Sequence, residues 1–152
     1  MTVYYVDSSV WVKRYYEETG TSRAQELFSG EHVLACSTLG LVEVAATLSR
    51  KQRAAELSIQ GRDKSLAELE RDWQQFVQID VVAEIIAEAT RLARDFALRG
   101  SDAIHLASAL AAFQRLAGSE HQAVLATSDQ ELKRAAGALG VVLLDPEEPT
   151  RP

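Results

Sequence analysis

The chain has 152 residues, of which 47% are hydrophobic and 25% charged, proportions that predict one globular domain with a single core. Its only cysteine, Cys36, excludes an internal disulfide and a thiolate metal cluster, and no stretch reaches the roughly 18 apolar residues of a membrane span. The first residues lack the basic flank and apolar run of a secretion signal, which predicts a cytoplasmic protein. The formal net charge of −6 counts against a nucleic acid as partner, because nucleic-acid binders usually present a basic face.

In chain order, the N-terminal half predicts two strands, each followed by helical sequence. The β-branched and aromatic run before Asp7 is typical of a buried strand, and Ser8 or Ser9 can cap the helix that follows. Ser37 or Thr38 can cap a later helix in the same way. The expected elements are a strand over 3–6, a helix from 8 to near 20, a helix over 21–28, a strand over 32–36 and a helix of about 15 residues from 38.

The C-terminal half continues the alternation of helices with short apolar runs. Leu66, Leu69, Trp73 and Phe76 are spaced as one face of an amphipathic helix, so the two aromatic residues are expected to pack in the core. The elements expected next are an extended segment over 77–82, a helix over 85–96 stopped by Gly100, an apolar helix beginning near 101, a strand over 123–126, a short helix opened by Ser128 or Asp129, and a strand over 141–144. The acidic, proline-broken tail, 146–152, is expected to be disordered.

Short apolar strands that alternate with helices predict an α/β layered fold with a parallel sheet. No glycine-rich phosphate loop is present, so a nucleotide cofactor has no support in the sequence. In open parallel sheets, ligands bind beyond the carboxyl ends of the strands. That edge of the sheet is therefore where functional side chains are expected.

Four acidic residues adjoin these apolar segments. Asp7 and Asp129 directly follow strands, Glu43 lies within STLGLVEVAATL, and Asp102 opens the apolar helix. Ordinary structural roles exist for three of them: Asp7 and Asp129 can be helix N-caps, and Asp102 can complement a helix dipole. Glu43 is harder to explain in this way, because glutamate is seldom buried without a partner. If all four meet at one edge of the sheet, their mutual repulsion requires a counter-charge.

A divalent cation is the counter-charge that suits such a set. Basic side chains are an alternative, but Mg²⁺ or Mn²⁺ prefers a set of ligands that are all oxygen. No spacing of histidine or cysteine suggests zinc. A carboxylate-bound metal polarises a phosphate, generates hydroxide from water and stabilises the leaving oxygen, so the pattern favours phosphoryl-transfer chemistry.

Four segments, YYVDSSVWVKRYYEE, STLGLVEVAATLSR, LRGSDAIHLASAL and ATSDQEL, resemble the successive signatures of the PIN domain in order and spacing. More closely, the set resembles the VapC-type toxins of bacterial and archaeal toxin–antitoxin pairs, over residues 3–144. The resemblance implies one PIN domain over 1–145, built as a three-layer α/β/α sandwich with a central parallel five-stranded sheet. It also implies a metal-dependent endoribonuclease toxin of a type II toxin–antitoxin system, which hydrolyses RNA phosphodiester bonds.

The resemblance also assigns the catalytic and metal-binding residues. Asp7, Glu43 and Asp102 match the principal ligands of Mg²⁺ or Mn²⁺, and Asp129 completes the acidic quartet, directly or through water. A metal-activated water would attack the scissile phosphate in line and leave a 5′-phosphate and a 3′-hydroxyl.

Two hydroxyl residues, Ser8 and Thr127, match positions where the family often has a hydroxyl near the site. Toxins of this kind usually form homodimers and are silenced by a cognate antitoxin protein whose tail enters the acidic groove. The resemblance therefore implies an antitoxin, an RNA substrate and a second copy of the chain as partners, and no membrane.

Several residues near these motifs allow two interpretations. Lys13 and Arg14, on the helix after the first strand, either contact RNA phosphates or are ordinary solvated charges. Trp11, Tyr15 and Tyr16 either stack on bases or contribute to a dimer interface.

His105 lies one turn from Asp102 and invites a role as general base. A packing role with one hydrogen bond is the preferred interpretation, since a metal already supplies the hydroxide. Two other functions stay open. A non-catalytic PIN-fold module that binds RNA or protein would suit the acidic composition but has no need of four acids. A haloacid-dehalogenase-like phosphatase would also place an aspartate after its first strand but needs a second acid where Ser9 stands.

Overall fold

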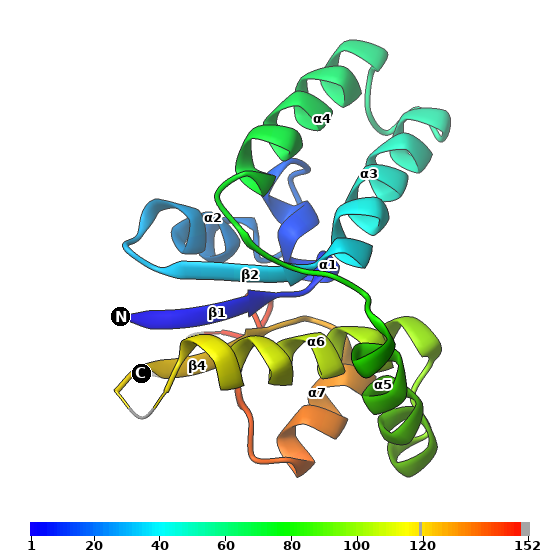
Figure 1. Ribbon diagram of the computed structural model, residues 1–152. Coiled ribbons are helices and arrows are strands. Elements are labelled where there is room, and N and C mark those ends of the chain that lie inside the picture. Colours follow the sequence, from blue (N-terminus) through cyan, green and yellow to red (C-terminus); the bar gives the residue numbers. More distant parts are fainter. Residues whose placement is uncertain (119, 150–152) are drawn as a thin grey trace.

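The computed structural model describes residues 1–118 and 120–149, and one sheet of five parallel strands forms its centre (Figure 1). The strand order is β3-β2-β1-β4-β5, so the chain runs outward from β1 to β3 and then returns to the other side of β1. The carboxyl ends of β1 and β4 flank this reversal, which is the expected place for a ligand site. The strands are β1 (Thr2–Val6), β2 (Val33–Ser37), β3 (Val77–Ile79), β4 (Gln122–Ala126) and β5 (Val142–Leu144).

Helices cover both faces of the sheet. In Figure 1, α1 to α4 lie on one side, with α3 and α4 paired as a hairpin, and α5 to α7 lie on the other. This is the three-layer α/β/α sandwich predicted from the sequence. The helices are α1 (Ser8–Trp11), the 3₁₀ turn η1 (Val12–Arg14), α2 (Thr21–Ser29), α3 (Thr38–Arg53), α4 (Ile59–Trp73), α5 (Ala83–Phe96), α6 (Gly100–Leu116) and α7 (Gln130–Ala138).

The core explains why the apolar segments are where they are. Helix α6 packs against β1 and β2 in the middle of the sheet, and it is therefore apolar along most of its length. Between the sheet and the helices on the opposite side, Trp11 stacks on Phe76 with ring centroids 4.5 Å apart, and Trp73 packs against both rings. The packing roles expected of Trp73 and Phe76 are confirmed, and Cys36 is also buried in this core.

Two predicted helix boundaries are wrong. The helix expected from 8 to near 20 ends at Trp11 and continues only as a 3₁₀ turn to Arg14, and its N-cap is Asp7 rather than a serine. Gly100 does not stop the preceding helix but is the first residue of α6. Helix α5 instead ends at Phe96 and is followed by Ala97, which takes the left-handed conformation with a φ of 53° that glycine more commonly supplies.

The segment after β5 is bound to the rest of the domain. The Asp145 carboxylate accepts hydrogen bonds from Ser128 Oγ and Lys133 Nζ, both at 2.8 Å. Pro146 is buried against Gly20, where an added Cβ would lie 3.0 Å from the proline carbonyl. Residues 146–148 of the segment expected to be disordered thus make specific contacts with the domain, and residues 150–152 of that expectation lie outside the described residues.

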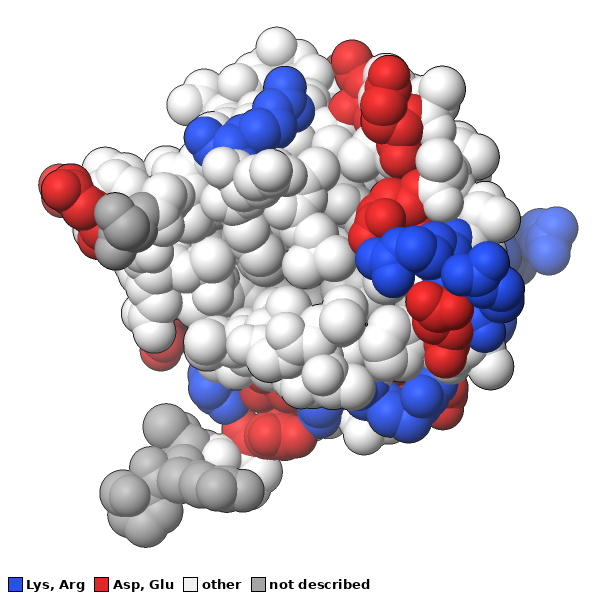
Figure 2. Space-filling view, turned by 60° about the horizontal axis from the view of Figure 1, so that its bottom comes forward, with Lys and Arg blue, Asp and Glu red and all other residues white. Residues whose placement is uncertain are grey.

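The outer face of α5 and α6 exposes apolar side chains. Ile86 is 44% exposed and Val82 is 47% exposed. A shallow groove of about 240 Å³ runs between the two helices and is lined by Ile86, Ala89, Ala93, Ala103 and Ile104 among others. Figure 2, which brings the α5–α7 side forward, shows a broad area without charged side chains, with charges gathered around its edges.

Candidate active site

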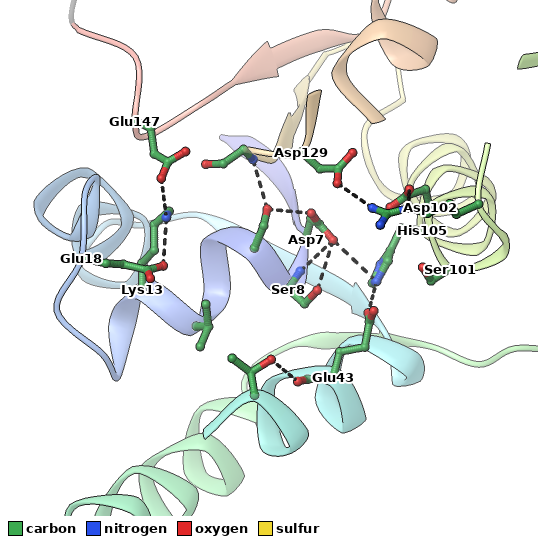
Figure 3. Close-up of a pocket in the computed structure, with 15 residues that line it drawn as sticks. Asp7, Ser8, Lys13, Glu18, Glu43, Ser101, Asp102, His105, Asp129 and Glu147 are labelled. Atoms are coloured by element: carbon green, nitrogen blue, oxygen red, sulfur yellow. Dashed lines mark hydrogen bonds and ion pairs between the residues drawn. The ribbon is translucent and has the colours of Figure 1, made fainter. Parts of the chain in front are cut away.

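A polar pocket of about 510 Å³ opens at the carboxyl edge of the sheet, and all four predicted acids line it (Figure 3). Asp7 follows β1, Glu43 projects from α3, Asp102 lies in the first turn of α6, and Asp129 caps α7. Residues separated by up to 122 positions in the chain thus meet because β1 and β4 are neighbours and α3 and α6 begin at the same edge.

Three donors hold the Asp7 carboxylate in a fixed orientation. Oδ1 accepts from the Ser8 backbone N–H at 2.8 Å, and Oδ2 accepts from Ser9 Oγ at 2.7 Å and from Thr127 Oγ1 at 2.8 Å. The Ser8 hydroxyl, at 3.5 Å from Oδ1, contributes less than that of Ser9. Thr127 also accepts the Asp129 backbone N–H at 3.1 Å and therefore connects two of the four acids.

Arg99 bridges Asp102 and Asp129. Its Nε donates to Asp102 Oδ2 at 3.1 Å, and its Nη2 donates to Asp129 Oδ2 at 3.0 Å. Asp129 Oδ1 accepts the Leu132 backbone N–H at 2.9 Å, so Asp129 is a helix N-cap as well as a residue of the pocket. Burial and the nearby Asp129 charge raise the pKa of Asp102 and together outweigh the lowering effect of Arg99.

His105 connects Glu43 to the interior. The imidazole is buried, Nε2–H donates to the Glu43 carboxylate, and the same nitrogen lies 3.5 Å from Asp7 Oδ1. Nδ1 shares a hydrogen bond of 2.8 Å with the Tyr5 hydroxyl, which also accepts the Ser37 N–H. Burial lowers the pKa of His105, but its hydrogen bonds with Cys36 and Glu43 and the charge of Asp7 together raise it well above 6.5. With both nitrogens engaged, the geometry favours a role in positioning Glu43.

The donor chemistry of the pocket fits a hard divalent cation. Its acidic groups supply only carboxylate oxygens, and the buried imidazole already has partners on both nitrogens. Within residues 1–118 and 120–149, no three acidic, histidine or cysteine side chains already surround one point closely enough to hold a metal. Arg99 pairs with Asp102 and Asp129, and His105 lies between Glu43 and Asp7.

The two basic residues considered for RNA contact are committed to other partners. Lys13 lines the pocket but is only 3% exposed, and its ammonium donates to Glu18 at 3.0 Å and to Glu147 at 3.2 Å. Arg14 lies outside the pocket and forms a double hydrogen bond with Asp72. Neither is the solvated charge of the alternative interpretation.

The three aromatic residues near Lys13 do not offer a stacking surface. Trp11 is fully buried, and its Nε1–H donates to the Tyr15 hydroxyl at 2.9 Å. Tyr15 in turn donates to Asp72 at 2.6 Å. The ring of Tyr16 is covered by the Lys51 ammonium, 3.9 Å from its centroid. These contacts make Trp11 and Tyr15 parts of the core rather than of a nucleic-acid or dimer surface.

Sequence reasoning missed Arg99 and Ser9 as residues of the site. Arg99 stands three positions before Asp102, a spacing at which opposite charges pair on a helix, and this signal was available. The sequence suggested Ser9 as a helix cap and as the position where a dehalogenase-like enzyme needs a second acid, but not as a residue of the site. In the structure its hydroxyl donates to Asp7, a hydrogen bond that an ionised carboxylate at this position could not make.

Comparison with known proteins decides the family. The PIN domain profile matches residues 4–138. The chain belongs to the PIN-domain family. Two relatives of this PIN protein are ribonuclease VapC45 and ribonuclease VapC49 of Mycobacterium tuberculosis, each 37% identical over 144 residues, which cover 92% of this chain and 93% of the relative. Family membership excludes the dehalogenase-like interpretation of Asp7.

A solved structure agrees with the PIN fold. The VapBC2 complex of Rickettsia felis, bound to a DNA fragment from its promoter, contains a chain that superposes with a TM-score of 0.64 at 16% identity. The match covers 95% of this PIN protein and 98% of the Rickettsia chain.

No helix in the described part of the PIN protein is long and apolar enough to cross a membrane.

Proposed function

We propose that this PIN protein is a Mg²⁺- or Mn²⁺-dependent endoribonuclease, the toxin of a type II toxin–antitoxin pair. The convergence of Asp7, Glu43, Asp102 and Asp129 in one pocket is the observation that carries the proposal. The ribonuclease names of both VapC relatives support the reaction, and the VapBC2 complex among the structural neighbours supports an antitoxin as partner.

The four carboxylates are the groups that would hold the metal. When bound, it supplies a hydroxide at neutral pH and neutralises charge that develops on the scissile phosphate. The protein contributes orientation. Ser9 and Thr127 hold the Asp7 carboxylate from one side, and His105 holds Glu43, so the oxygen ligands are positioned before any substrate arrives.

The pocket also suits the proposed partners. Its mouth is lined by carboxylates that a basic segment of an antitoxin could pair with, and occupation of these groups would block metal and RNA at once. RNA is the proposed substrate and the cytoplasm the proposed site of action. The hydrolysis would break the bond to the 3′-oxygen and leave a 5′-phosphate.

Self-association is proposed through the uncharged face of α5 and α6. Its apolar groove and the exposed Ile86 and Val82 side chains would lose solvent contact in a symmetric dimer. Light scattering of the purified protein is expected to give the mass of two chains of 16.7 kDa. A monomer at micromolar concentration would contradict the proposed dimer without affecting the proposed chemistry.

RNA cleavage by purified protein tests the function. Single-stranded RNA is expected to be cut in the presence of Mg²⁺ or Mn²⁺ and to stay intact in excess chelator. Asp7→Asn, which keeps size and most hydrogen bonds but removes a ligand charge, should lower the rate by at least about a hundredfold. Asp72→Asn, at a carboxylate paired with Arg14 outside the pocket, is the matched control. Cleavage at the wild-type rate by the Asp7 variant would refute the proposal.

A further inference from the structure

Arg99 occupies an unusual position in the pocket. Its side chain is 73% exposed, yet its guanidinium donates to two carboxylates on different elements, Asp102 in α6 and Asp129 at the start of α7. The two oxygens that it contacts, both Oδ2, belong to residues of the proposed metal-binding quartet. The Asp102 side chain is only 9% exposed, so the exposed Arg99 can leave it at little cost only when another cation takes its place.

A metal ion and Arg99 therefore compete for the same oxygens. This step rests on the proposed metal dependence of the site. A divalent cation that binds Asp102 and Asp129 satisfies the charge that holds the guanidinium, and it repels Arg99 at a separation of a few ångströms. Metal binding then releases Arg99 with no carboxylate partner in the pocket.

The other cationic groups of the pocket are not released in this way. Lys13 is buried between Glu18 and Glu147, and His105 is buried between Tyr5 and Glu43. His105 also faces two proposed ligands, Glu43 and Asp7, but its ring is buried. Arg99 is thus the one among these three lining residues that pairs with proposed metal ligands and has an exposed side chain. A free guanidinium offers parallel N–H donors that match the oxygens of a phosphate.

We propose that Arg99 acts in two states: it neutralises Asp102 and Asp129 before metal binds, and after metal displaces it, it binds a phosphate of the RNA. The two ligands are consequently linked, because metal binding creates the phosphate-binding group. This assigns Arg99 a substrate-binding role in addition to those of the acidic quartet.

The test compares Arg99→Gln with Arg91→Gln. Arg91 also pairs with two acids, Glu88 and Asp95, but on the exposed surface of α5, so its variant removes the same charge without touching the pocket. Calorimetry measures Mn²⁺ affinity of the metal-free proteins. Fluorescence anisotropy measures the affinity for a single-stranded 2′-O-methyl oligoribonucleotide, which has RNA phosphodiesters and is checked on a gel for cleavage, with and without Mg²⁺.

The two measurements are expected to change in opposite directions. Arg99→Gln should bind Mn²⁺ roughly fivefold more tightly, because the competitor is gone, and should bind the oligonucleotide in Mg²⁺ roughly fivefold more weakly. Arg91→Gln should change both by less than about twofold, since exposed charges at a distance are screened. Damage to the pocket would weaken both affinities and would overturn the proposal, as would equal values for the Arg99 variant and the wild type. Absence of Mn²⁺ binding in every protein would instead refute the metal-dependent function itself.

Discussion

The substitution Thr127→Val tests how the pocket is assembled. Valine has nearly the shape of threonine, so the change removes a hydroxyl without leaving a cavity. That hydroxyl is fully buried, donates to Asp7 Oδ2 at 2.8 Å and accepts the Asp129 N–H at 3.1 Å. Its loss removes the link from the Asp7 carboxylate to the Asp129 backbone while leaving the backbone in place.

The two hydrogen bonds give the expected magnitude. A bond to an ionised carboxylate contributes about 2 kcal/mol, and an N–H left without its acceptor at the edge of a hydrated pocket costs about 1 kcal/mol. The free energy of unfolding should therefore fall by about 3 kcal/mol. Cleavage should fall as well, because Asp7 loses one of the three donors that orient it.

Urea denaturation followed by circular dichroism measures the first effect, and RNA cleavage at saturating Mg²⁺ measures the second. Thr127→Ser is the matched control, since it keeps the hydroxyl and loses only a methyl group. The serine variant should retain most of the activity and lose about 1 kcal/mol of stability. If the free energy of unfolding of Thr127→Val lies within about 0.5 kcal/mol of the wild-type value, the hydroxyl does not hold Asp7 and Asp129 as described.

Two further substitutions test the surroundings of the pocket. Gly40→Ala places a Cβ against Cys36 Sγ at the start of α3 and should lower the free energy of unfolding in urea by about 1–3 kcal/mol. The control is Gly137→Ala, whose Cβ meets its nearest neighbour at 3.8 Å and which should be neutral or stabilising. Equal effects of the two substitutions would contradict the close packing of α3. Asp145→Asn tests the anchored C-terminal segment. Burial opposes ionisation of Asp145, but its hydrogen bonds, chiefly from Lys133, lower the pKa of its carboxyl group below 3.8. The carboxylate therefore stabilises the fold above pH 3.8, and this stabilisation is lost as the pH falls through the lowered pKa. The variant should thus be less stable than the wild type at pH 7, by about 1 kcal/mol, with the gap closing as the pH falls through the lowered pKa, and a gap that does not change with pH would refute the assignment.

The fold was predictable because its signals are local. Each strand is a short apolar run, and Ser37 and Asp129 cap their helices as expected. The errors occurred where tertiary contacts override local preference. Residues 15–20 could continue a helix by composition, but Tyr15 is held by Trp11 and Asp72, and Gly20 packs against the chain after β5. The helix-compatible composition of residues 15–20 gives no sign of these contacts.

Four of the six acidic residues that line the pocket were predicted, two of them for a similar reason. Asp7 and Asp129 follow strands, and the edge of a parallel sheet is a known meeting place, so position along the chain was enough. The groups that neutralise them were not predictable in this way. In the sequence, Lys13 is a basic residue after the first strand with no evident partner. Only the folded chain places Glu18 and Glu147 beside its ammonium group. Which charged side chains pair depends on the distances between elements in the folded chain, and these distances cannot be predicted from local sequence patterns.

These internal pairs also resolve the apparent conflict between an acidic protein and a polyanionic substrate. Net charge describes the whole surface, whereas a phosphate responds mainly to charges within about 10 Å at physiological salt. Unpaired, the four carboxylates of the pocket would repel RNA. Under the proposed function, Arg99 and a bound divalent ion would together offset three of the four charges of the quartet, so that a cation would face the phosphate. If the proposed function holds, the acidic residues serve to concentrate a divalent metal, whose charge would then face the RNA phosphate.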